Sequence, residues 1–129
     1  MKNLLLIFTL LFSSVFLSSP SYAGWAKVSE GADGRTYYVD YERIRKHDAF
    51  VYYWDLSDYL KPTEYGDLSA KVYRQGDCKL FRVKNLSFSW HKEPMGGGTG
   101  DVQEPIKKDW IYPSPNSSGG IILKSVCSR

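Results

Sequence analysis

The sequence of 129 residues is poor in the residue types from which metal centres and hydrolytic sites are most often built. It contains two histidines and two cysteines, and neither His47 nor His91 stands at a metal-ligand spacing from a cysteine, an aspartate or the other histidine. A Gly-x-Ser-x-Gly turn, which would present a nucleophilic serine, is absent. The sequence therefore predicts no metal, no cofactor and no enzyme. An enzymatic alternative would have to rest on Asp40, Asp55 and His91.

An excess of charge of one sign is also lacking. The chain has 17 Lys and Arg against 14 Asp and Glu, a net charge of +3, which by itself does not indicate a nucleic-acid partner. Hydrophobic residues make up 43% of the chain and charged residues 24%, fractions that are typical of one globular domain and exclude a disordered chain.

Long hydrophobic runs are limited to one, at the N-terminus. Lys2 precedes an apolar stretch from Leu4 to Leu17, and Ser21 and Ala23 occupy the small positions that a signal peptidase reads. The run is short for a membrane anchor, which needs about 20 residues. We expect residues 1–23 to be a signal peptide and 24–129 to be the mature domain. No cysteine stands near the cleavage point, so the sequence predicts an exported chain, periplasmic or secreted, with no lipid anchor and no membrane span.

Both cysteines, Cys78 and Cys127, lie in the mature part. A pair of cysteines in an exported protein usually forms a disulfide. The loop between them has about 50 residues, for which chain entropy gives a stabilisation of roughly 4 kcal/mol. The bond would pin the C-terminal tail to the body of the domain.

The rest of the mature chain is rich in strand signals. Aromatic and β-branched residues alternate in segments that lie between turn residues. In Leu80–Trp90 this alternation changes phase, which indicates a β-bulge near Lys84-Asn85. Arg45–Asp48 is predicted to be a solvated loop, Gln75–Asp77 a turn and Met95–Gly100 a mobile loop. Tight turns between neighbouring strands indicate an antiparallel sheet. The predicted strands are Thr36–Asp40, Ala49–Ser57, Ser69–Arg74, Leu80–Trp90 and Lys108–Tyr112.

The tail from Asn116 to Ser128 is ambiguous. Ile122 and Val126 form an i,i+4 pair on one helical face, and the preceding serines are plausible N-caps. A strand over residues 121–123 competes with this helix. The histidines and aspartates are expected at the solvated surface or in turns.

Basic residues gather in the middle of the chain with Tyr73, Phe81 and Phe88 between them. This pattern could bind an anionic polymer such as a heparin-like glycan or a nucleic acid. We favour the alternative of a charged sheet face over an aromatic core, because a small domain must bury most of its aromatic rings. The basic residues are Lys71, Arg74, Lys79, Arg82, Lys84 and Lys92.

Several segments together resemble the bacterial surface-adhesin E family. They are Trp25, Tyr38-Val39-Asp40, Tyr53-Trp54, Ser69-Ala70-Lys71-Val72-Tyr73, Asp77-Cys78, Leu86-Ser87-Phe88-Ser89-Trp90, Pro94-Met95-Gly96, Trp110 with Pro113-x-Pro115-x-Ser117, and Val126-Cys127. The resemblance implies an α+β fold: a single twisted antiparallel sheet of about six strands, with a C-terminal helix packed on its concave side and tied by the Cys78–Cys127 disulfide. It also implies adhesion to host matrix or plasma proteins and self-association in some members.

We therefore expect a non-enzymatic exported domain that recognises a protein or glycan of the host or of the envelope, with no nucleic-acid partner. An exposed edge strand could pair with its twin and form a homodimer. The alternative is a periplasmic protein that binds a small ligand or inhibits an enzyme, with a cavity between helix and sheet. Members named as adhesins are surface lipoproteins, whereas this chain lacks the lipid-acceptor cysteine. The predicted binding residues are Tyr41, Tyr59, Tyr65, Tyr112, Lys71, Arg74, Arg82 and Lys84.

Overall fold

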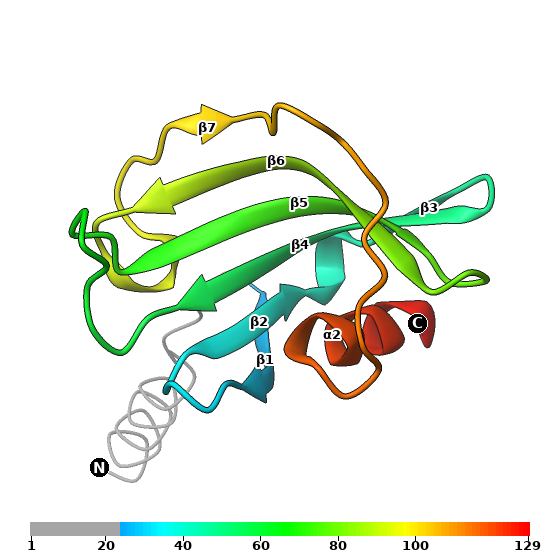
Figure 1. Cartoon of the computed structure of the whole chain (residues 1–129), viewed down its shortest axis with the longest axis horizontal. Helices are drawn as coiled ribbons and strands as arrows, with labels where there is room; N and C mark the ends of the chain where they lie inside the picture. The colour runs from blue at the N-terminus through cyan, green and yellow to red at the C-terminus, as the bar shows by residue number, and fades with distance from the viewer. Residues whose placement is uncertain (1–23) are drawn as a thin grey trace, which may run out of the picture.

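The computed structural model describes residues 24–129 as one antiparallel sheet with a C-terminal helix. The predicted signal peptide, residues 1–23, lies outside the described residues. Figure 1 shows the curved sheet and the helix beneath it. The elements are β1 (Trp25–Glu30), β2 (Thr36–Asp40), the 3-10 turn η2 (Tyr41–Arg43), β3 (Arg45–His47), β4 (Phe50–Asp58), β5 (Ser69–Asp77), β6 (Arg82–His91), the 3-10 turn η3 (Pro94–Gly96), β7 (Val102–Gln103) and α2 (Ser118–Cys127).

The seven strands follow the order β1-β2-β4-β5-β6-β7, and β3 pairs with β4 at the end that β2 leaves free. All named pairs are antiparallel. The predicted sheet and C-terminal helix are therefore confirmed, with seven strands in place of about six. β5 pairs at nine positions with β4 and at nine with β6, and β4 and β5 stand in the middle of the strand order.

Two strand predictions need correction because pairing overrides local sequence signals. Arg45–His47 was expected to be a loop, yet Arg45 pairs with Tyr52 of β4 and the segment forms β3. Its three charged or polar residues are poor strand formers, but a backbone ladder to a central strand supplies the hydrogen bonds. Lys108–Tyr112 was expected to be a strand, but it contributes only one bridge, from Ile111 to Val83. The strands β1 and β7 were not predicted.

The predicted turn at Gln75–Asp77 is also wrong, because β5 continues to Asp77. Gly76 gave the turn signal, but its role is to let the helix approach. A Cβ at this position would lie 2.9 Å from Leu123 Cδ1 and 2.9 Å from Val51 Cγ1. Glycine inside a strand marks a close approach of this kind.

The β-bulge lies one residue beyond the predicted position. Tyr73 of β5 pairs with Ser87, whereas the next residue, Arg74, pairs with Asn85. Leu86 is therefore the extra residue on β6, and the alternation of β6 reverses there.

Helix α2 resolves the ambiguity of the tail in favour of the helix. The Ser117 hydroxyl accepts a hydrogen bond from the Gly120 N–H at 3.1 Å and caps the first turn. The helix then buries Ile122, Leu123 and Val126 against the sheet.

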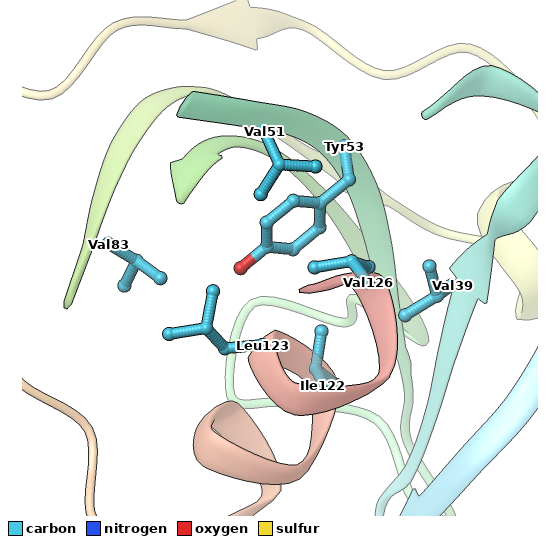
Figure 2. Packing of buried hydrophobic residues seen from close by; sticks show 7 residues of the cluster. All are labelled: Val39, Val51, Tyr53, Val83, Ile122, Leu123 and Val126. Carbon is cyan, nitrogen blue, oxygen red and sulfur yellow. The ribbon is translucent and has the colours of Figure 1, made fainter. Parts of the chain in front are cut away.

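The core lies between α2 and one face of the sheet. Figure 2 shows Leu123 and Val126 beside the ring of Tyr53, and Val51 on the same side of β4. Side chains fill the space between helix and sheet, where the small-ligand alternative needs a cavity. The full cluster is Val39, Val51, Tyr53, Val83, Ile122, Leu123 and Val126.

The predicted disulfide is confirmed. Cys78 in the β5–β6 turn is bonded to Cys127 at the end of α2, with 5.8 Å between their Cα atoms. Asp77 organises this turn, because its carboxylate accepts hydrogen bonds from the N–H groups of Lys79 and Leu80, each at 3.1 Å. The bond therefore joins the helix to a turn that is itself held in place.

Candidate binding surface

The two faces of the sheet have different surroundings. Helix α2 covers the face that bears Val51 and Tyr53, which we call the helix face. Side chains at directly opposed positions of neighbouring strands share a face. The pairing of Trp54 with Tyr73 and of Tyr52 with Gln75 therefore assigns these four residues to the other side, which we call the open face.

Aromatic rings form a continuous strip on the open face. The Tyr52 and Tyr73 ring centroids are 6.3 Å apart with an angle of 28° between the planes, and those of Trp54 and Tyr73 are 4.9 Å apart. All three side chains are partly exposed. We call Tyr52, Trp54 and Tyr73 the aromatic strip. Partly exposed tyrosine and tryptophan of this kind are enriched at recognition surfaces.

A row of side chains crosses the open face at right angles to the strands. Arg45 pairs with Tyr52, Tyr52 with Gln75, and Gln75 with Lys84, so these four residues lie side by side on four strands. With about 4.8 Å between neighbouring strands, the ends of this cross-strand row are about 14 Å apart. At the β3 end lies a shallow groove of about 520 Å³, lined by Arg45, Lys46, His47, Tyr52 and Tyr73.

Trp110 borders the row along its side, next to Phe50 and Arg82, which lie two residues from Tyr52 and Lys84. Its ring lies 5.7 Å from that of Phe50. The guanidinium of Arg82 lies 4.0 Å from the Trp110 centroid and the Lys84 ammonium 4.5 Å, both over the ring. These cation–π contacts hold both basic groups at this border.

Two carboxylates at the ends of the open face are already neutralised. Asp40 pairs with Arg43 and Asp77 with Arg82. Burial acts to raise the pKa of Asp77, but hydrogen bonds from the Leu80 N–H and the Arg82 guanidinium outweigh it and lower that pKa below its usual value. The lowered pKa keeps Asp77 charged, and each of the two aspartates is occupied by an arginine partner.

Other cations on this face have no carboxylate partner within the described part of the chain. Among residues 24–129, no carboxylate lies within ion-pair distance of Arg45, Lys71 or Lys84. Asp58, which shares the face, accepts a hydrogen bond from the Met95 N–H at 2.8 Å. The open face consequently carries an excess of positive charge.

The four predicted tyrosines lie in different places. Tyr65 and Tyr112 are exposed, at 76% and 65%. Tyr41 packs against the core with the Arg129 guanidinium over its ring, and Tyr59 is partly buried beneath Arg35. None of the four belongs to the aromatic strip, and their role in binding stays a prediction.

The predicted basic residues divide between the two faces. Lys71, Arg82 and Lys84 lie on the open face, whereas Arg74 lies opposite Tyr53 on the helix face. Arg74 forms an ion pair with Asp55 and donates a hydrogen bond to Asn85. Although burial acts to lower it, the Asp55 carboxylate raises the pKa of Arg74. We therefore leave Arg74 out of the surface.

His91 and several aspartates are buried, contrary to the expectation that they lie at the surface. His91 is 3% exposed, and its ring nitrogens contact the Ser89 hydroxyl at 2.8 Å and the Gly97 carbonyl at 3.2 Å. Burial, assisted by the nearby Lys71 ammonium, lowers the pKa of His91. The imidazole thereby holds the glycine-rich segment against the sheet. The buried aspartates are Asp40, Asp55, Asp67 and Asp77.

The residues named for an enzymatic alternative have separate partners. Asp40 is bonded to Arg43, Asp55 to Arg74 and His91 to the segment after η3. Within residues 24–129, no three metal-ligating side chains come together. In the same part of the chain, no helix reaches the length and hydropathy of a membrane span.

Sequence reasoning missed the aromatic strip and Arg45. The signal was present, because Tyr52 and Trp54 alternate with Val51 and Tyr53 along one strand. Both sets are apolar, so the pattern indicated a strand that is central in the sheet or covered on both sides. It did not reveal which set the helix would cover.

Comparisons with known proteins agree with this fold. The family model described as surface-adhesin protein E matches residues 25–128. Crystal form II of Haemophilus influenzae protein E is similar with a TM-score of 0.62 and 16% identity, over 86% of this chain and 92% of that one. Protein E from non-typeable Haemophilus influenzae gives a TM-score of 0.56 and 15% identity, over 86% and 77%. No curated protein matches this chain.

Proposed function

Because this chain belongs to the surface-adhesin protein E family, we propose that it is an exported, non-enzymatic binding domain that attaches to a protein or glycan of the host surface or of the cell envelope. The signal-like N-terminus supports export, and the lack of a cysteine beside Ala23 supports a chain without a lipid anchor.

The observation that carries this proposal is the open face. It presents the aromatic strip and an excess of positive charge, while the opposite face is used to hold α2. A surface with partly exposed aromatic rings and basic groups around them is suited to recognition. The filled space between helix and sheet gives no support to a small-ligand carrier.

The first experiment locates the protein. Intact source cells are treated with an external protease, and cell, periplasmic and medium fractions are then immunoblotted. Loss of the band from intact cells, or a band in the medium, supports attachment to a host surface. A protected band released with the periplasm overturns direct adhesion and places the partner in the envelope.

The second experiment tests the face. Beads that carry residues 24–129 are allowed to settle on epithelial layers and on immobilised extracellular matrix. The variant Tyr52→Ser/Tyr73→Ser is compared with Tyr65→Ser/Tyr112→Ser, a matched pair of tyrosines away from the strip.

We expect adhesion to fall with the first pair and to persist with the second. The reverse result would assign binding to the loops and reject the open face. If the wild-type beads adhere to neither surface, the adhesin role is wrong.

A further inference from the structure

We propose that the open face binds a sulfated polysaccharide, laid across the sheet along the cross-strand row from Arg45 to Lys84. This inference rests on the proposed binding function and names the class of its partner. It draws on three features: unneutralised cations, the aromatic strip between them and the openness of the surface.

The cations select a polyanion. Arg45 at one end of the row and Lys84 at the other have no carboxylate partner among the described residues, and Lys71 lies further along β5 on the same face. The row spans about 14 Å, too far for one small anion to bridge. Arginine matches planar or tetrahedral oxyanions with several donors at once. A chain with a sulfate on most sugar units satisfies the cations at both ends of the row together.

The aromatic strip selects a sugar between the charges. Tyr52 stands in the row beside Arg45, and Tyr73 and Trp54 continue the strip along the strands. The faces of pyranose rings carry C–H groups that pack on the electron-rich faces of aromatic rings. Gln75, the remaining member of the row, offers an amide donor and acceptor to hydroxyl groups.

The form of the surface favours an extended polymer over a buried ligand. The groove beside Arg45 is open and shallow, at about 520 Å³, and its lining residues Tyr52 and Tyr73 continue it onto the open face. A sulfated polysaccharide is also a polyanion that an exported protein meets. Acidic proteins and single-stranded nucleic acids are the competing polyanions, and the test includes both.

The experiment measures heparin binding to residues 24–129, by titration at several salt concentrations. The variants are Arg45→Ala and Lys84→Ala, and the matched controls are Lys61→Ala and Lys107→Ala, exposed lysines on loops away from the row. We expect each row variant to weaken binding about fivefold and to lower the salt slope by about one. The controls should change neither quantity. Equal effects in both sets would overturn the proposal, because attraction would then follow net charge alone.

A second set of variants tests the sugar contact. Tyr52→Phe keeps the ring and should bind heparin as the wild type does, whereas Tyr52→Leu should weaken binding several-fold. Thermal melting checks that both variants fold. If Tyr52→Leu binds as tightly as Tyr52→Phe, the aromatic contact is rejected and the proposal fails.

Competing polymers identify the class. Heparin should displace a bound fluorescent heparin fragment far better than polyglutamate or single-stranded DNA at equal charge, and neutral dextran should not compete. Equal competition by polyglutamate or DNA would overturn the sugar assignment.

Bead adhesion separates this inference from the proposed function. Adhesion that free heparin or removal of surface sulfated glycans abolishes supports the inference. Adhesion that survives both treatments but is lost after protease treatment of the host surface rejects the polysaccharide and leaves the binding function standing with a protein partner.

Discussion

Removal of the Cys78–Cys127 bond should destabilise the domain chiefly through the unfolded chain. The two cysteines are 49 residues apart in sequence, and the chain-entropy estimate for a loop of this length is roughly 4 kcal/mol at 25 °C. Ile122, Leu123 and Val126 bury their side chains between helix and sheet, and we expect this packing to persist when the bond is absent. Each such side chain contributes about 1.5–3 kcal/mol on burial, so α2 should remain docked in the folded variant.

The assay compares the wild type with the double variant Cys78→Ser/Cys127→Ser, which leaves no free thiol among the described residues. Urea unfolding at 25 °C is followed by tryptophan fluorescence and far-UV circular dichroism. We expect a loss of about 4 kcal/mol, equivalent to a fall in Tm on the order of 15 °C or more for a small domain. The native spectra should be unchanged. Reduction of the wild type provides the same comparison without a mutation.

Hydrogen exchange of the α2 amides distinguishes the two ways in which the bond could act. If it restricts the unfolded chain, α2 in the variant should open with the same free energy as the sheet. A helix that exchanges freely while β4 and β5 stay protected would refute this reasoning, because the bond would then be tethering a weakly packed helix. A stability loss below about 1 kcal/mol would refute the entropic estimate itself.

Three further predictions concern the helix face and the buried polar groups. Gly76→Ala should lower the free energy of urea unfolding by about 1–3 kcal/mol, because its Cβ meets Leu123 and Val51. Combined with Leu123→Ala, the two losses should be less than additive, since the truncation of Leu123 frees that space. Strict additivity would contradict the proposed contact. Asp55→Ala should lower the free energy of unfolding by about 3 kcal/mol, because it leaves the Arg74 side chain, which is 24% exposed, without its carboxylate partner. A loss below about 1 kcal/mol would show that solvent replaces Asp55. Because the pKa of His91 is lowered in the folded state, the unfolded chain binds more protons than the folded chain below pH 6.5. The free energy of unfolding should therefore be at its full value above that pH and fall as the pH drops. The urea midpoints at pH 7.5 and pH 5 should differ less in His91→Gln than in the wild type, and an equal difference would assign the pH dependence to other groups.

The sequence allowed prediction of the features that have local signals. Thr36–Asp40 is bounded by turn residues and forms β2 with the predicted ends. The phase change between Val83 and Phe88 located the bulge to within one residue of Leu86. The cysteine pair in an exported chain predicted the disulfide. Each of these depends on periodicity, turn chemistry or compartment, which a single sequence records.

The errors arose where pairing or packing against another segment decides the local structure. Arg45–His47 is a strand because β4 lies beside it, and Gly76 is a strand residue because Leu123 packs on it. Gly76 and Leu123 are far apart in the chain, and the charged or polar residues of β3 have propensities that disfavour a strand. His91 was expected at the surface because its neighbours are polar, but the glycine-rich segment folds back and covers it.

The candidate surface was harder to predict than the fold because it depends on which face of the sheet α2 packs against. Along β4, Val51 and Tyr53 alternate with Tyr52 and Trp54, and either pair could have faced the core. Gly76 decides which face the helix covers, because it lies on the same face as Val51 and its missing side chain leaves room for Leu123. The larger aromatic rings then remain partly exposed.

The bulge at Leu86 allows β6 to place Val83 in the core and Lys84 on the open face. Phe88 lies on the helix face, and an unbroken alternation would place Lys84 on that face too and Val83 on the other. The extra residue reverses the phase, so that Val83 pairs with Gly76 and enters the core while Lys84 pairs with Gln75 and completes the cross-strand row. The same irregularity therefore supplies an aliphatic side chain to the packing of α2 and a cation to the open face. Stability and the proposed binding are thus divided between opposite sides of the sheet, and substitutions of exposed row residues such as Arg45 should change binding without changing the core.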